Sequence, residues 1–478
     1  MPKRYLVLLL ALFVGLDLTF AFVQYCQLPI DGDLAAIVVP GAWYRPVLHD
    51  PFGWAVLSKN AVYAAPNRFF AHAAMVGYLR NVPRWLQLVA SPIDSIYLAG
   101  AIFSTGVHAL LLVLLGAYVR LRLPDAGGRS AWLTAALLTP LFQTAGFYGQ
   151  MGIVSRSLTF TFFYAFPLAL LLAWLLPFYR AACQGKPLRL PWPLVLVWLA
   201  LAVVLAFNGP VVAATVAVLL AVVAAQWMWA RRPTGLAAAW ATRPPWCSPQ
   251  ALGLGLALAV LCAYSLFIGR NNVENNHPFT LWQLYQRLPY GIYEELSSKL
   301  GLPLLLGFVL LNAQLLRRLA PPSAEAPRVR QLLRLVGVFA GLYIVLLPLG
   351  GYRPYRFYLL RNDSILPVLL GLLLAYGLSA VYLLGQLRGR ARQWYVGGVL
   401  LLAGIFLNAD RRLWLRDNNT CERQALGQLS WATEEVVHLP ADCTVMSWER
   451  VTDYQQSALN AELLYYWGVT PRRTLYYQ

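Results

Sequence analysis

A chain of 478 residues in which 59% are apolar and only 12% are charged does not have the composition of a soluble globular protein. Its mean hydropathy of +0.56 indicates an all-α polytopic membrane protein. The net charge of +18 would suit a nucleic-acid partner, but the basic residues are concentrated in alternate loops, so we expect a lipid bilayer and no nucleic acid.

The apolar run over 5–25 is long enough to cross a bilayer. Further stretches without Asp, Glu, Lys or Arg follow it along the chain. One of them, 190–230, is too long for a single span, and Asn208-Gly209-Pro210 divides it into two. Together they predict about eleven transmembrane helices, and the remaining stretches are 95–119, 130–155, 157–179, 244–269, 300–316, 335–352, 364–387 and 393–409.

Basic residues mark every second loop. Nineteen of the 38 Lys and Arg residues lie in these loops, beginning with Lys3 and Arg4, beside only two acids, Asp125 and Glu325. Loops that face the cytoplasm carry such an excess of Lys and Arg. We therefore predict a multi-pass protein of the cell (inner) membrane with a cytoplasmic N-terminus and an external C-terminus.

Most residues outside the predicted spans lie on the external side. We predict a transmembrane domain over 1–409 with external loops 26–92 and 270–299, and a small external α/β region over 410–478. Within the first loop, 68–79 has the pattern of a surface-lying amphipathic helix, with Arg68, His72 and Arg80 on its polar face.

The C-terminal region shows helical periodicity over 454–467 and β-prone segments at 443–446 and 474–477. Cys421 and Cys443 both lie in it. An oxidising external compartment permits a disulfide between them.

Asp31 and Asp33 follow the first span almost directly and are separated by one glycine. In a turned chain their carboxylates can converge, where they would serve as a general base for a hydroxyl or as hard ligands for a divalent cation. An isolated Asp-x-Asp more often has a structural role, in which one acid caps the next helix and the other is solvated. Because this pair heads a long external loop, we favour the functional interpretation.

A carboxylate motif just after the first span, followed by surface-lying helices and many further spans, resembles the GT-C superfamily of integral-membrane glycosyltransferases. The resemblance covers the first 95 residues well and the rest by topology alone. It implies a polyprenyl-phosphate-linked sugar donor, a glycan, lipid or protein acceptor, and an acid that acts as catalytic base or in a metal site; the matching residues are Asp31 and Asp33. The chain shows no second acidic motif beside the first, and candidates for a second carboxylate or polar site are Asp50, Asp94, Glu274 and His277.

Arg353, Arg356 and Arg361 lie within nine residues on the predicted external side. If this segment is helical, Arg353 and Arg356 share a face, and guanidinium groups suit phosphate oxygens. We predict that these arginines, with Arg156 on a short external turn, bind the donor phosphate. The alternative is that they contact ordinary lipid head groups.

The predicted activity is the transfer of a sugar from the lipid-phosphate donor to an acceptor at the external face. One alternative is a polymerase or ligase of lipid-linked glycans, which would depend more on the external arginines. Another is a transporter or flippase, in which Asp17 within the first span would be a coupling site. The simpler interpretation of Asp17 is a protonated acid bonded to a neighbouring helix, through Gln143, Asn208 or Asn312.

Overall fold

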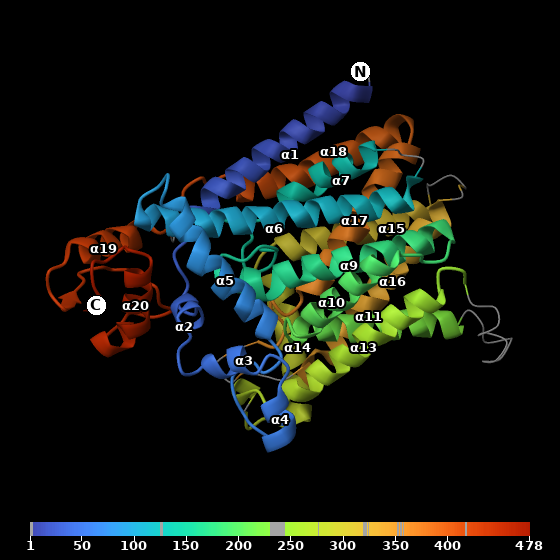
Figure 1. Ribbon diagram of the computed structural model, residues 1–478. Coiled ribbons are helices and arrows are strands. Elements are labelled where there is room, and N and C mark those ends of the chain that lie inside the picture. Colours follow the sequence, from blue (N-terminus) through green and yellow to red (C-terminus); the bar gives the residue numbers. More distant parts are fainter. Residues whose placement is uncertain are drawn as a thin grey trace.

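The computed structural model describes residues 3–124, 128–229, 244–275, 277–318, 323, 325–350, 353, 356, 358–415 and 418–478. These residues are mostly helical and include one two-stranded sheet. In Figure 1 the long helices lie side by side, and the short helices of the first loop and the C-terminal region gather at one end of them. The segments predicted to be external thus lie at the same end of the molecule.

Seven of the described helices are long and apolar enough to cross a membrane, and the number is eight if a pair bent by 87° forms one span. The bent pair is α14 (Leu281–Ser297) and α15 (Gly301–Arg318). The chain therefore has the architecture of a polytopic α-helical membrane protein, while the count of about eleven spans and the sidedness of the termini stay predictions. The seven are α1 (Lys3–Tyr25), α6 (Pro92–Arg122), the continuous segment of α8 (Leu158–Phe160), η3 (Thr161–Ala165) and α9 (Phe166–Gln184), α11 (Pro210–Trp229), α13 (Pro249–Gly269), α16 (Ala326–Leu346) and α17 (Leu366–Gln386).

Helix α17 lies at the centre of the bundle and packs against α6, α15 and α16. It carries no charged residue, so it can be buried on every side without an unpaired charge. Helix α10 (Trp192–Ala206) precedes α11, and the chain breaks between them at the predicted site. Gly209 adopts φ +120°, a conformation that side-chain-bearing residues rarely adopt, and Pro210 begins α11 where its missing N–H is not needed.

The segment 130–155 is not the continuous helix that its apolar composition predicts. Helix α7 ends early (Arg129–Leu138) and is followed by the short turn η2 (Thr139–Leu141) and then by irregular chain. Side chains from other elements satisfy this irregular backbone, because Asp410 accepts hydrogen bonds from the N–H groups of Ala145, at 2.6 Å, and Gly146, at 3.2 Å.

The first loop forms the short helices α2 (Leu34–Val38), α3 (Arg45–His49) and α4 (Trp54–Lys59), followed by the longer α5 (Phe69–Leu86). Helix α5 confirms the predicted helix and extends it. Its predicted polar face is wrong in one respect, because Arg68 and His72 are buried rather than exposed. Helix α5 packs against α2 and α6, so its inner face is covered by protein.

The chain leaves the bundle through α18 (Gly389–Ala409), and the C-terminal region then forms α19 (Thr420–Trp431), η7 (Tyr454–Ser457) and α20 (Ala458–Tyr466). Its two strands, β1 (Val436–His438) and β2 (Leu475–Tyr477), pair in parallel. The predicted helix and the predicted C-terminal strand are confirmed, but the β-prone segment 443–446 is not a strand. The disulfide between Cys421 and Cys443 is confirmed.

Candidate active site around Asp31 and Asp33

Asp31 is buried, and the beginning of α8 holds its carboxylate. Ser157 Oγ donates to it at 2.9 Å, and Thr159 donates through its backbone N at 3.0 Å and its Oγ1 at 2.7 Å. The backbone N of Asp33 adds a bond of 3.3 Å. Burial raises the pKa of Asp31, and the bonds from Thr159 and Ser157 act in the opposite direction. With both oxygens engaged, Asp31 ties the first loop to α8.

Asp33 is partly exposed and stands at the N-cap position of α2, but its side chain makes no cap hydrogen bond. The side chain of Trp448 donates a hydrogen bond to it. Burial and the charge of Asp31 raise the pKa of Asp33, whereas Trp448 and Arg353 lower it. A partly exposed carboxylate with a raised pKa is a better proton acceptor than an ordinary aspartate.

The C-terminal region lies directly over the loop that carries these two acids. A Cβ atom added to Gly32 would lie 2.5 Å from the backbone N of Trp448, so only glycine permits this approach. The Trp448 ring also lies 5.9 Å from the ring of Phe160, which follows the residues that hold Asp31. Residues from both ends of the chain therefore surround Asp33.

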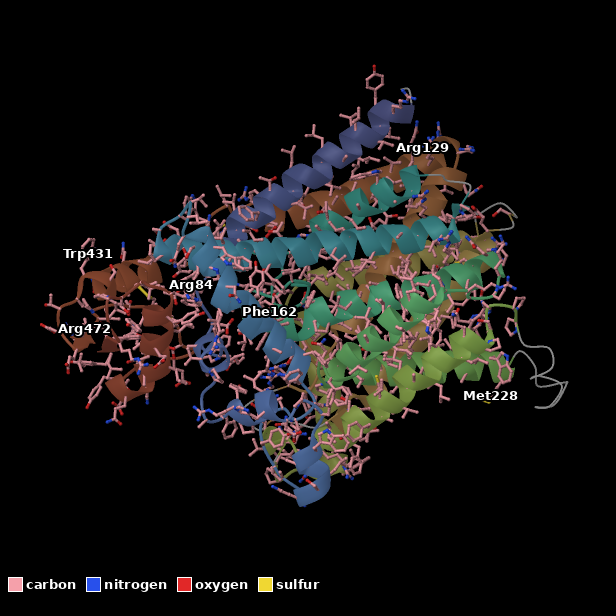
Figure 2. The ribbon with its side chains drawn as sticks, in the orientation of Figure 1. Arg84, Arg129, Phe162, Met228, Trp431 and Arg472 are labelled. Carbon is pink, nitrogen blue, oxygen red and sulfur yellow. A yellow bond between two sulfur atoms is a disulfide. The ribbon has the colours of Figure 1, made fainter. Side chains whose placement is uncertain are left out.

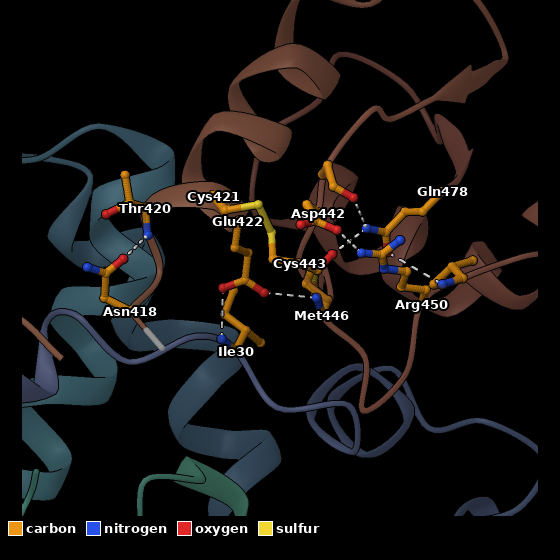
Figure 3. The surroundings of a disulfide bond; sticks show 12 residues. Ile30, Asn418, Thr420, Cys421, Glu422, Asp442, Cys443, Met446, Arg450 and Gln478 are labelled. Carbon is orange, nitrogen blue, oxygen red and sulfur yellow. Dashed lines mark hydrogen bonds and ion pairs between the residues drawn. A yellow bond between two sulfur atoms is a disulfide. The ribbon is translucent and has the colours of Figure 1, made fainter. Parts of the chain in front are cut away.

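Glu422 fixes the two segments that meet at Asp33 (Figure 3). Its carboxylate accepts hydrogen bonds from Ile30 N at 2.9 Å, from Met446 N at 2.8 Å and from the Tyr97 hydroxyl at 2.8 Å. Burial raises the pKa of Glu422 to about 7. Because Ile30 precedes Asp31 and Met446 lies two residues before Trp448, Glu422 positions both sides of the candidate site.

Glu274 and Arg353 form an ion pair beside Asp33. Both interact electrostatically with Asp33, and both also interact with Tyr44. Burial raises the pKa of Tyr44, and the charges of Asp33 and Glu274 raise it further. The structure therefore places Glu274, one of the candidates for a second carboxylate, near the Asp pair.

Arg356 and Arg361 share a different acid, Asp363, at 3.1 Å and 2.5 Å. Arg353 and Arg356 are not helical in the structure; Arg356 N donates to Arg353 O at 2.9 Å, which forms a turn. The prediction of a shared helical face is therefore wrong, and the two arginines bind different carboxylates. The neighbouring residues 351–352, 354–355 and 357 lie outside the described residues.

Arg156 lies on the Asp363 side of the site, with its guanidinium 5.1 Å from the centre of the Tyr148 ring. Tyr148 interacts electrostatically with both Arg156 and Asp363. A small hollow is lined by Asp363, Phe160, Ser155, Tyr164 and Asn362. Its volume of about 10 Å³ is enough for one water molecule at most.

Three further candidates make their contacts elsewhere. Asp50 accepts hydrogen bonds from the N–H groups of Trp54 and Ala55, at 2.7 and 2.8 Å, and from Tyr63, so it organises the loop around α4. Asp94 bonds Ser91 at the start of α6 and forms an ion pair with Arg423. The ring of His277 stacks on that of Phe279, 6.2 Å away.

Asp17 has a hydrogen-bond partner, but not one of the three predicted. Thr139 Oγ1 in η2 donates to it at 2.5 Å. The predicted partners bond other groups: the Gln143 side chain donates to Pro140 O, that of Asn208 to Val204 O, and that of Asn312 to Ser379. Because η2 packs against α1, the Thr139 hydroxyl lies within hydrogen-bond reach of Asp17.

A divalent cation would need several ligands of the right type close together. Among the residues that the structure describes, no group of three or more His, Cys, Asp or Glu side chains is suited to hold a metal ion. The Asp31 oxygens are already engaged by Ser157 and Thr159, which leaves Asp33 as a single carboxylate. The described residues therefore do not fit a metal site at the Asp pair.

No protein-family model matches the chain, and no curated protein matches it. The resemblance to GT-C glycosyltransferases thus rests on the position of the Asp pair and on topology.

Sequence reasoning missed several residues of this site, namely Ser157, Thr159, Asp363, Glu422 and Trp448. Ser157 and Thr159 lie 126 and 128 residues from Asp31 in the sequence. Glu422 and Met446 had one local signal, because each lies close to a cysteine of the predicted disulfide. The others have none.

Proposed function

We propose that the protein is an integral-membrane glycosyltransferase of the GT-C type. It moves a sugar from a polyprenyl-phosphate-linked donor to an acceptor hydroxyl at the external face of the inner cell membrane. The observation that supports this most is the difference between two neighbouring acids. Asp31 is fully engaged in hydrogen bonds, whereas Asp33 is partly exposed, has a raised pKa and lies among residues from distant parts of the chain.

In the proposed reaction, Asp33 takes the proton of the acceptor hydroxyl. The hydroxyl oxygen forms a bond to the anomeric carbon while the bond between that carbon and the phosphate oxygen breaks. The electron pair of the broken bond leaves with the phosphate, whose growing negative charge is stabilised by arginine. Asp31 holds the loop in place and Glu422 holds the Trp448 segment against it, so both are positioning residues.

Arg353, Arg356 and Arg361 are the arginines that we propose for this role, although carboxylates already contact them. Arg353 is paired with Glu274, and Arg356 and Arg361 are paired with Asp363. Glu274 matches the charge of Arg353, whereas Arg356 and Arg361 share the one carboxylate of Asp363, so a phosphate would have to join or replace a carboxylate there. Such a replacement is reasonable for arginines that release the polyprenyl phosphate after each turnover, because the carboxylate stabilises the guanidinium between turnovers.

The test is Asp33→Asn, which preserves the volume of the side chain and removes the base. We expect sugar transfer to fall by roughly 10²–10⁴. The assay supplies membranes with a panel of radiolabelled polyprenyl-phosphate sugars and measures label in the acceptor fraction. Asp33 cannot act as a base once it is protonated. Because its pKa is raised, sugar transfer by the unaltered protein should decline on acidification at a pH above the ordinary pKa of an aspartate.

Asp442→Asn is the matched control, since the Asp442 side chain is 95% exposed in the C-terminal region. It should transfer sugar normally. Normal transfer by a variant with both Asp31→Asn and Asp33→Asn would refute the mechanism. A transporter would instead tolerate the change at Asp33 and fail on substitution of Asp17.

A further inference from the structure

Arg68 is a buried arginine at the start of α5. Its side chain is only 6% exposed, and its guanidinium carbon lies 4.7 Å from the centre of the Phe163 ring and 5.8 Å from that of Tyr164. These two rings belong to η3, which follows α8 and therefore the residues that hold Asp31. Arg68 is thus surrounded by protein at the external end of the bundle.

Among the described residues, Arg68 lacks the anionic partner that Arg353, Arg356 and Arg361 have. Within the described part of the chain, no carboxylate lies within ion-pair distance of its guanidinium and no hydrogen bond from its side chain forms; its Nε atom is buried and unpartnered. By contrast, Arg353, Arg356 and Arg361 each have a carboxylate. The neighbouring His72 adds no second positive charge, because burial lowers its pKa to about 3 and keeps the ring neutral.

A buried guanidinium without a counter-charge is costly, since removal of an ion from water is offset only by good pairing. Contacts with aromatic faces offset a part of this cost. The remaining positive potential is strengthened by the N-terminus of α5, which has no side-chain cap, because helix N-termini attract negative charge. The chemistry that satisfies such a site is an oxyanion that can accept two parallel N–H bonds.

The packing around Arg68 is specific. A Cβ atom on Gly209 would lie 3.0 Å from Arg68 Nε, so the glycine lets the turn between α10 and α11 approach the guanidinium. Asn67, the preceding residue, is fixed by a hydrogen bond of 3.1 Å to Ser265 O. Arg68 is therefore held in one position by three separate segments, as a binding residue should be.

Arg68 is also connected to the candidate base. Tyr44 interacts electrostatically with Arg68 and with Asp33, and its ring lies 5.3 Å from that of His72. Arg68 and Asp33 thus both lie close enough to Tyr44 to interact with it. A leaving phosphate and an attacking hydroxyl must both lie near the same sugar, so a site that binds the phosphate has to be close to the base.

We propose that Arg68 is the central cation of a binding site for a phosphate group, and that the phosphate is carried by a lipid. The site itself follows from the burial and the missing partner of Arg68. Only its assignment to the sugar donor rests on the proposed function. Free phosphate has the same chemistry at the guanidinium, and the experiment separates the two sources.

The experiment measures the thermal unfolding of the full-length protein in a neutral detergent, with farnesyl monophosphate, phosphatidylglycerol or inorganic phosphate as probes. Farnesyl monophosphate should raise the unfolding temperature of the unaltered protein at concentrations where inorganic phosphate has little effect. Arg68→Gln should weaken its apparent affinity at least about tenfold, and Arg68→Lys should lose affinity to a smaller extent.

The matched control is Arg84→Gln on the same helix. Arg84 is exposed, contacts Tyr466 and lies at the junction of α5 with the C-terminal region (Figure 2). The surroundings of Arg68 lie deeper, because Phe162, the neighbour of Phe163 in the sequence, lies inside the bundle in the same view. Arg84→Gln should bind the probe normally. Without any probe, Arg68→Gln should be at least as stable as the unaltered protein, because it removes an unpaired buried charge.

Equal, Arg68-dependent effects of farnesyl monophosphate and inorganic phosphate would support the phosphate site and refute the lipid as its source. An Arg68-dependent effect of phosphatidylglycerol equal to that of farnesyl monophosphate would support a lipid phosphate and refute the assignment of the site to the polyprenyl donor. The site is refuted if no probe stabilises the unaltered protein, or if the effect persists in Arg68→Gln. Asp33→Asn should keep the full effect, so loss of transfer and loss of phosphate binding can be told apart.

Discussion

Replacement of Glu422 by alanine tests whether the C-terminal region positions the loop that carries Asp33. The Glu422 carboxylate accepts bonds of 2.9 Å from Ile30 N, 2.8 Å from Met446 N and 2.8 Å from the Tyr97 hydroxyl, and the residue is 1% exposed. Each buried donor that loses its acceptor costs about 1–3 kcal/mol. Water that enters the space left by the side chain recovers part of this cost, so we expect a loss of about 3–5 kcal/mol.

This loss should appear as faster amide hydrogen exchange at both ends of the Glu422 contact. At about 1.4 kcal/mol per factor of ten, the exchange of the Ile30 and Met446 amides should accelerate by roughly 10² to 4 × 10³. Sugar transfer should fall with it, because Asp33 loses the support of Trp448. Hydrogen exchange monitored by mass spectrometry in detergent micelles resolves the two segments.

Glu462→Ala is the control. Glu462 pairs with Arg473 at 2.9 Å, but its side chain is 36% exposed, so the change should cost at most about 1 kcal/mol. Unchanged exchange of the Ile30 and Met446 amides in Glu422→Ala would refute the positioning role. Faster exchange at Met446 alone would show that the C-terminal region undocks without disturbing the first loop.

Two further predictions concern the same end of the molecule. Burial raises the pKa of Glu422 to about 7 from its ordinary 4.5. Between these two pH values the folded state binds a proton that the unfolded chain releases. The stability that this proton contributes is complete below about pH 4.5 and is lost as the pH rises through about 7. Thermal unfolding across this range should show the decline, and Glu422→Gln should not. The combined change of Cys421→Ser and Cys443→Ser opens a loop with a separation of 22 residues and should cost about 3 kcal/mol, measured as a lower unfolding temperature that matches that of the reduced protein.

The sequence by itself determined the class of the protein and the position of most helices. Hydropathy and charge are properties of neighbouring residues, so they located α1, α6 and α17 without knowledge of the fold. The break before α11 followed from Gly209 and Pro210 for the same reason. The nearby cysteines Cys421 and Cys443 also allowed their disulfide to be anticipated, although not decided.

Tertiary structure decided which polar groups are engaged. Asp31 and Asp33 are equivalent in sequence, yet only Asp31 meets Ser157 and Thr159, which lie more than a hundred residues away and reach it through helix packing. The charge of Arg68 predicted an exposed side chain on the polar face of an amphipathic helix, but α5 packs with that face inward. The residues next to Arg68 in the sequence do not indicate whether its buried side chain will have a partner. Local patterns fix which segments are helical because backbone hydrogen bonds close within a few residues, whereas the pairing of buried charges depends on contacts between distant segments that exist only once the chain is folded.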